Sequence, residues 1–173
     1  MIQGELKNIR SDAWIQWASD AYDDQKNCLF LKGDWTIFPI YARMSPEGEW
    51  LFPIPAIKGL PPDQIEELRK KLTLLFPETT KLLASIKSVR FAAFSRLKAH
   101  AELDPHQHAE RPYRVLHMGI QIPPNGCCGL MVDGKTHVWK KEGEVVVFED
   151  HYRHSAWNRS DQDRIVFYME FEP

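Results

Sequence analysis

Three histidines in the second half of the chain have the types and spacing of a metal site. His106 and His108 form an HxH pair just after Asp104-Pro105, and His154 follows much later, just past a predicted strand end. In a double-stranded β-helix, an early strand and a late strand can bring such side chains together at the barrel mouth. Neutral imidazoles suit Fe(II) and leave coordination positions open. We therefore predict an iron site made by His106 and His154, with His108 as a possible third ligand.

The spacing of these histidines is more informative than their number. All seven histidines lie in the C-terminal half, among predicted strands and turns. They are His100, His106, His108, His117, His137, His151 and His154. A single histidine in a strand-rich protein is usually a surface or hydrogen-bonded residue, so the others carry no prediction of metal binding.

Arg164 opens the last apolar run of the sequence and could bind a cosubstrate. Strand alternation alone allows its side chain to point either to solvent or to the barrel interior. An interior guanidinium would offer a planar fork that binds a carboxylate bidentately. In that position Arg164 would hold the far end of a dicarboxylate such as 2-oxoglutarate.

Short runs rich in β-branched and aromatic residues, separated by turn residues, fill the chain from Val89 onward. We predict strands at 89–97, 114–122, 145–148 and 164–171. The predicted separators are Leu103-Asp104-Pro105, Pro123-Pro124-Asn125-Gly126, Asp133-Gly134, Glu142-Gly143 and Ser160-Asp161-Gln162-Asp163. Short strands at this spacing, without helices between them, favour an antiparallel sandwich or barrel.

The first half of the chain has a mixed pattern. Residues 61–77 begin with Pro61-Pro62-Asp63 and repeat apolar residues at helical spacing, which predicts a capped helix with one buried face. A weaker helical pattern covers 12–21. Residues 34–43 are typical of an extended segment, apart from Pro39.

Composition limits the class of protein and its partners. With 173 residues, 43% of them hydrophobic, the chain can bury one core, so we expect one domain at 1–173. The net charge of −2 gives no reason to expect nucleic acid or an anionic membrane as partner, and favours a small, neutral partner. Residues 1–20 lack the apolar run of a signal peptide or membrane span, so we expect a cytoplasmic location. The three cysteines are expected to be reduced thiols.

An ordered set of motifs over residues 33–173 resembles the aspartyl/asparaginyl β-hydroxylase family. The motifs are Gly33-Asp34-Trp35, Phe76-Pro77-Glu78-Thr79-Thr80, Ser95, Pro105-His106, His117-Met118-Gly119-Ile120-Gln121-Ile122-Pro123, Trp139, Glu142-Gly143, Val146-Val147-Phe148-Glu149-Asp150, His154-Ser155-Ala156-Trp157-Asn158 and Arg164. The resemblance implies a mainly β fold, a double-stranded β-helix of the jelly-roll or cupin kind with supporting N-terminal helices. It also implies a dioxygenase that uses Fe(II), 2-oxoglutarate and O₂ to hydroxylate an unactivated C–H bond. Its expected substrate is the β-carbon of Asp or Asn in a peptide or a related amino acid, although relatives also act on free amino acids and lipid acyl chains.

The same resemblance implies roles for individual residues. His106 and His154 match the two iron ligands of the family, which lacks an acidic third ligand. Ser95 and Arg164 match the pair that holds the distal carboxylate of 2-oxoglutarate. His117 matches a residue beside the end of the cosubstrate that chelates iron.

Two positions depart from the family pattern. His108 stands where the family typically has glycine, so it could ligate iron, support the ligands from behind or face solvent. The family arginine two residues before the His117 position is Val115 here, and Arg114 is shifted by one place. A shift of one place reverses side-chain direction in a regular strand. Either a β-bulge turns Arg114 inward, or the proximal carboxylate of the cosubstrate is held differently.

Two other functions remain open from the sequence. One is a three-histidine cupin-like dioxygenase or isomerase that binds metal through His106, His108 and His154 without 2-oxoglutarate. The other is a non-catalytic β-sandwich binding module, because a fold does not determine a function. Arg164 and Ser95 favour the 2-oxoglutarate enzyme over the three-histidine enzyme.

Overall fold

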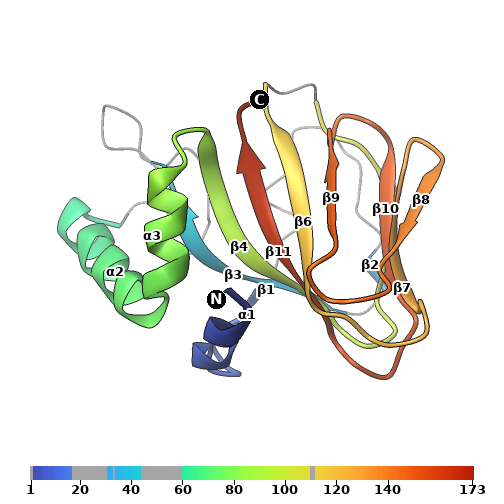
Figure 1. The fold of residues 1–173 in the computed structure, drawn as a ribbon, viewed down its shortest axis with the longest axis horizontal. Coiled ribbons are helices and arrows are strands. Elements are labelled where there is room, and N and C mark those ends of the chain that lie inside the picture. The colour runs from blue at the N-terminus through green and yellow to red at the C-terminus, as the bar shows by residue number, and fades with distance from the viewer. Residues whose placement is uncertain (1, 17–30, 33, 44–59, 110–111) are drawn as a thin grey trace.

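The computed structural model describes residues 2–16, 31–32, 34–43, 60–109 and 112–173. Two β-sheets face each other, and the helices lie to one side of them (Figure 1). The elements are α1 (Ile2–Glu5), the 3₁₀ helix η1 (Leu6–Asn8), β1 (Ile15–Gln16), β2 (Leu31–Lys32), β3 (Trp35–Ala42), α2 (Pro62–Leu75), α3 (Pro77–Ser85), β4 (Val89–Leu97), β5 (Glu102–His106), β6 (Arg114–Gln121), β7 (Cys128–Val132), β8 (Lys135–Val138), β9 (Val145–Phe148), β10 (His154–Asn158) and β11 (Arg164–Phe171). No helix in these ranges is long and apolar enough to cross a membrane.

Strands β4 to β11 pair as one long ribbon folded back on itself. β4 pairs with β11, β5 with β10, β6 with β9, and β7 with β8, and every pair is antiparallel. Winding of this ribbon gives two sheets. The six-stranded sheet has the order β1-β3-β4-β11-β6-β9, and the five-stranded sheet has the order β2-β5-β10-β7-β8. This pairing is that of a jelly roll. The predicted mainly β, double-stranded β-helix fold is therefore confirmed.

Strand β11 is buried on both faces because the helices cover the outside of the larger sheet (Figure 1). Ile165 and Phe167 point outward into a cluster with Leu83 of α3. Arg164 and Tyr168 point to the interior, where they line a pocket. The alternation of strand side chains thus explains why an arginine can open an apolar strand and still be buried.

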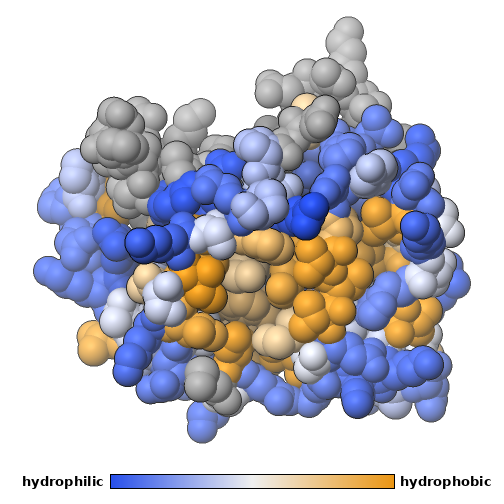
Figure 2. All heavy atoms as spheres, turned by 45° about the horizontal axis from the view of Figure 1, so that its top comes forward, coloured by the Kyte–Doolittle hydropathy of each residue, from blue (hydrophilic) through white to orange (hydrophobic). Residues whose placement is uncertain are grey.

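The surface also carries apolar side chains. Figure 2 shows a continuous apolar area on one face of the molecule, framed by polar residues. Separately, Val145 and Val147 are about half exposed on β9, which ends the order of the larger sheet. Cys127 and Cys128 are free thiols, as expected, whereas Cys28 lies outside the described residues.

The predicted strands agree closely with the structure. β4, β9 and β11 have the predicted bounds, β6 ends one residue earlier than predicted, and β3 occupies the extended segment at 34–43. Strands β2, β5, β7, β8 and β10 were not predicted. Leu103-Asp104-Pro105, predicted as a turn, belongs to β5, because pairing with β10 extends the chain there.

The helical predictions need two corrections. The helix predicted at 61–77 is α2, but a second helix, α3, begins directly after it. Pro77 was taken as the end of one helix, whereas it occupies the first turn of the next, where its missing N–H costs nothing. The helix predicted at 12–21 is wrong for Ile15–Gln16, which form β1 and pair with β3. The rest of that prediction, 17–21, lies outside the described residues.

Candidate metal centre and cosubstrate pocket

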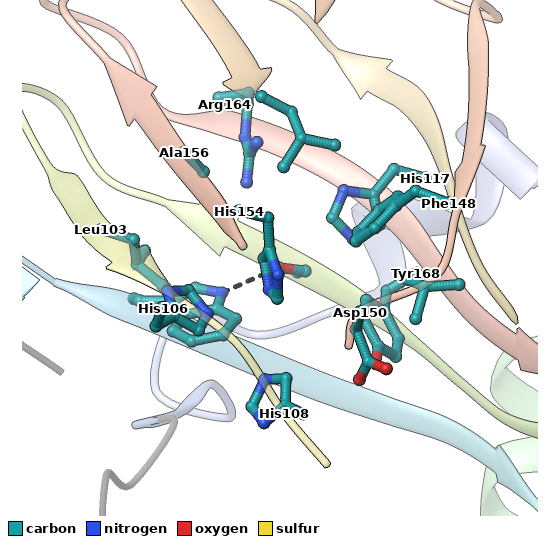
Figure 3. A pocket seen from close by; sticks show the side chains of 14 residues that line it. Leu103, His106, His108, His117, Phe148, Asp150, His154, Ala156, Arg164 and Tyr168 are labelled. Atoms are coloured by element: carbon teal, nitrogen blue, oxygen red, sulfur yellow. Dashed lines mark hydrogen bonds between the residues drawn. The ribbon is translucent and has the colours of Figure 1, made fainter. Parts of the chain in front are cut away.

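A pocket lies between the two sheets and draws its walls from both (Figure 3). It is lined by Trp35, Ser95, Leu103, His106, His108, Val115, His117, Leu130, Phe148, Asp150, His154, Ala156, Arg164 and Tyr168. Three of its histidines stand together on one side, and Arg164 extends into it from the start of β11.

The three histidines converge because of strand register. His106 ends β5 and His154 begins β10, and the two are cross-strand partners with ring centroids 4.2 Å apart. His108 follows His106 by two residues, and such residues share one face of an extended chain. Its ring centroid lies 5.5 Å from each of the other two. One nitrogen from each of the three rings lies within 4.8 Å of the others (Figure 3).

Hydrogen bonds set the ring orientation of two of these histidines. Nδ1 of His106 is 2.7 Å from the carbonyl oxygen of Asp104, and Nδ1 of His154 is 2.8 Å from that of Tyr152. A carbonyl can only accept, so in each neutral ring Nδ1 carries the hydrogen and Nε2 keeps its lone pair. A backbone carbonyl is one of the usual hydrogen-bond partners of a metal-ligating histidine.

Burial keeps both rings neutral. The pKa of His106 is lowered to about 4, first by burial and then by the neighbouring His154. Burial also lowers the pKa of His154, against the opposing effect of its bond to Tyr152. Metal ligation requires deprotonated ligands, so the two imidazoles are ready to bind at neutral pH.

Arg164 is a buried cation, and two of its guanidinium nitrogens have no hydrogen-bond partner among the described residues. It is 2% exposed, and its Nε and Nη1 make no hydrogen bond to any residue in the described part of the chain. The guanidinium carbon lies 5.3 Å from the ring centroid of Trp139. Burial lowers the pKa of Arg164 to about 10, so the group remains charged at neutral pH. A buried charge of this kind is costly unless an anion meets it.

Ser95 and His117 add polar atoms to the same pocket. The Ser95 hydroxyl accepts a hydrogen bond of 2.9 Å from Trp35 Nε1, which leaves its own hydrogen available to donate. Nδ1 of His117 is buried and has no hydrogen-bond partner among the described residues. Burial, and then the charge of Arg164, hold the pKa of His117 well below its usual range. The pocket thus offers polar groups with capacity left for a ligand.

Arg114 does not reach the pocket. The register of β6 against β9 and β11 is regular from Val115 to Met118, so no bulge turns Arg114 inward. Val115 is 1% exposed and lines the pocket, whereas Arg114 is exposed and forms an ion pair of 3.2 Å with Glu149. The alternative in which a bulge brings Arg114 to the cosubstrate is therefore wrong.

Two polar lining residues were not singled out from the sequence. Asp150 is 6% exposed, and its carbonyl oxygen accepts a 3.1 Å hydrogen bond from the backbone N–H of His108. Tyr168 donates its hydroxyl hydrogen to Glu170, at 2.7 Å. The inward direction of Tyr168 could have been found from the alternation that starts at Arg164. Asp150 stood only within a longer motif, and nothing marked it individually.

The jelly-roll pairing and the histidine cluster define a cupin-like protein with a candidate metal centre. A family model described as aspartyl/asparaginyl beta-hydroxylase matches residues 1–173, so the chain belongs to this hydroxylase family. The resemblance predicted from the sequence is thereby confirmed.

The match to named relatives covers only part of the length of each relative. An ornithine lipid ester-linked acyl 2-hydroxylase from Rhizobium tropici is 31% identical over 96 residues, which are 55% of this chain and 34% of that protein. The human aspartyl/asparaginyl beta-hydroxylase is 28% identical over 142 residues, which are 80% of this chain and 16% of that protein. The chain thus spans about a third of the first and about a sixth of the second.

Solved structures with a similar arrangement are distant in sequence. A predicted oxalate decarboxylase from Thermotoga maritima superposes with a TM-score of 0.45 and 13% identity, covering 83% of this chain and 85% of that one. A Cupin_2 domain of an XRE family transcriptional regulator from Enterobacter cloacae gives a TM-score of 0.40 and 16% identity, covering 48% of this chain and 81% of that one. At these scores the fold assignment rests on the strand pairing itself.

Proposed function

We propose that this protein is an Fe(II)- and 2-oxoglutarate-dependent dioxygenase that hydroxylates an unactivated C–H bond. The observation that carries the proposal is the buried guanidinium of Arg164, with two nitrogens unpartnered among the described residues, in one pocket with three histidines. A dicarboxylate fits this arrangement because one end can meet the guanidinium while the other faces the metal. Membership of a hydroxylase family supports the class of reaction.

Five polar lining residues have specific parts in this proposal. His106 and His154 hold the iron through Nε2, and Arg164 binds the distal carboxylate, with the Ser95 hydroxyl donating to it. His117 lies beside the other end of the cosubstrate. When bound, Fe(II) with 2-oxoglutarate and O₂ supplies the oxidising chemistry, which yields the hydroxylated product, succinate and CO₂.

Apolar lining residues keep the pocket dry around these groups. Leu130 and Val115 are 2% and 1% exposed, and Phe148 packs with its ring centroid 5.6 Å from that of His154. Excluding water strengthens the interaction between Arg164 and a carboxylate, because the local dielectric is low. The protein thereby fixes which end of the dicarboxylate reaches the metal.

For the substrate, we propose the β-carbon of Asp or Asn in a peptide or a related amino acid. The human relative is named for aspartyl and asparaginyl hydroxylation, and the Rhizobium tropici relative for an acyl chain of ornithine lipid. Parallel incubation with Asp- and Asn-containing peptides, free Asp and Asn, and ornithine lipid separates these classes. The proposal expects the mass gain of one oxygen in a peptide or amino acid, and oxygen added only to the lipid would refute the substrate assignment.

The cosubstrate assignment is tested by anaerobic titration of the Fe(II) protein with 2-oxoglutarate. We expect a visible charge-transfer band that saturates at one equivalent, and its loss in Arg164→Met. Arg114→Met serves as the control, because Arg114 lies outside the pocket and its loss should leave the band intact. If the wild-type protein binds Fe(II) but gives no band, the protein is a metal enzyme of another kind.

A further inference from the structure

We propose that His108 is a third protein ligand of the metal, so that this chain holds the ion through three imidazoles. The inference rests on the metal-binding part of the proposed function and is independent of 2-oxoglutarate. It concerns a position at which the sequence departs from the pattern it otherwise resembles. Three features of the structure support it: the distances between the rings, the backbone that fixes His108, and the charges of the pocket wall.

The distances are close to those of one shared ion. An imidazole nitrogen lies about 2.1 Å from a bound zinc ion, so two nitrogens that meet such an ion at right angles, as facial ligands do, are about 3.0 Å apart. The nitrogens of the three rings lie within 4.8 Å of one another, so closing on one ion requires each nitrogen to move by about 1 Å at most. The ring of His108 is equally far, at 5.5 Å, from His106 and His154. It therefore stands at the third corner of a triangle, as a facial ligand would.

The backbone fixes His108 on the same side as the other two rings. Gln107 and Ala109, its neighbours in the chain, are exposed, whereas His108 is partly buried and lines the pocket. The N–H of His108 donates to the carbonyl oxygen of Asp150, at 3.1 Å. Asp150 lies in the connection that leads into β10 and His154. One hydrogen bond thus ties the segment after His106 to the segment before His154.

The charges of the pocket wall indicate what a third metal ligand would do for cosubstrate binding. Among the described lining residues, Arg164 is the only arginine or lysine, because Val115 is apolar and Arg114 points away. Only one end of a dicarboxylate therefore has a cationic side chain to orient it, and the metal must orient the other. Three protein ligands leave three positions of an octahedral ion open, and two leave four. His108 thereby reduces the arrangements that a chelating cosubstrate can adopt.

The test is Co(II) binding to the metal-free protein without 2-oxoglutarate, measured by competition with a chromophoric chelator and by the visible spectrum of bound Co(II). The variants are His108→Ala, Gln107→Ala as the matched control on the opposite side of the same segment, and His106→Ala as the benchmark for loss of a ligand. We expect one Co(II) per chain in the wild type. For His108→Ala we expect affinity weakened by at least about 10-fold and a changed Co(II) spectrum, with Gln107→Ala unchanged.

A second variant separates ligation from a structural role. In His108→Gly, free imidazole can enter the space left by the side chain, and we expect it to restore most of the Co(II) affinity and the wild-type spectrum. The proposal is overturned if His108→Ala binds Co(II) as tightly as the wild type while His106→Ala does not. It is equally overturned if the loss in His108→Gly is not rescued by imidazole. If the wild type and His106→Ala bind Co(II) with the same affinity, the metal site itself is refuted. If the protein binds Co(II) as expected but does not bind 2-oxoglutarate, the cosubstrate assignment fails and the role of His108 stands.

Discussion

Two residues of this pocket have buried polar atoms that do little to stabilise the fold. Arg164 is buried with part of its guanidinium unpaired among the described residues, and His117 carries a buried nitrogen in the same condition. Such groups lose their hydration on folding and regain little from the protein. Two such groups at one site are what a binding site for a polar ligand requires.

Replacing Arg164 should therefore separate stability from binding. We expect Arg164→Met to raise the free energy of unfolding of the metal-free protein by about 1–4 kcal/mol, because an apolar chain of similar length replaces a buried charge. Urea unfolding at neutral pH measures this change. Arg114→Met, which removes an exposed charge, should stay within about 0.5 kcal/mol of the wild type. A less stable Arg164→Met would mean that the charge is already compensated in the folded protein.

The neutral histidines predict how the metal-free protein responds to acid. His106 has a folded pKa of about 4 against an ordinary value of 6.5, so between these values the unfolded chain binds more protons than the folded one. Stability is therefore full above pH 6.5 and is lost as the pH falls toward 4, by at most about 1.4 kcal/mol per pH unit for this one group. His154 and His117, whose pKa values are also lowered, act in the same direction.

Thermal unfolding between pH 7 and pH 4, with a chelator present, measures this loss. Carboxylates also titrate in the lower part of this range, so the informative quantity is the difference between the wild type and His106→Gln. The variant should lose less stability on acidification than the wild type. Parallel pH profiles would show that His106 is protonated as easily in the folded chain as in the unfolded one.

At the scale of elements, the sequence predicts the parts whose local pattern is strong. β4, β9 and β11 were found with their bounds because each contains several β-branched or aromatic residues within a largely apolar run. β5 and β10, which carry His106 and His154, were not found, because they contain Pro105, histidines and polar residues and become strands through pairing with each other. The ligand spacing could be recognised from the sequence, whereas the register that brings the two rings together could not.

The packing of α3 on the larger sheet gives a prediction about an element. Leu83 is 1% exposed and packs in a cluster with Phe94 and Phe167, behind the strands that carry Ser95 and Arg164. We expect Leu83→Ala to lower the free energy of unfolding by about 2–5 kcal/mol, because it leaves a cavity under the helix. Denaturant unfolding measures this, and the adjacent Leu82→Ala is the matched control, since Leu82 is 40% exposed. Equal effects of the two substitutions would contradict the packing described for α3.

At the scale of the whole molecule, the two sheets bring distant parts of the sequence to one pocket. The larger sheet supplies Ser95 and Arg164, and the smaller sheet supplies His106 and His154. A ligand that contacts both groups connects the two sheets. The metal and the dicarboxylate should therefore stabilise the protein together more than the sum of their separate effects.

This coupling can be measured without any turnover. We expect 2-oxoglutarate to raise the melting temperature strongly when Mn(II), chosen because it is not readily oxidised, is already bound, and only weakly in the metal-free protein, where Arg164 meets one carboxylate alone. Because coupling between binding sites is reciprocal, 2-oxoglutarate should tighten Mn(II) binding by the same factor. Succinate, which lacks the 2-oxo group, should show little coupling, and Arg164→Met should abolish it. If 2-oxoglutarate raises the melting temperature equally with and without Mn(II), the dicarboxylate binds away from the metal and the two halves of the pocket do not form one site.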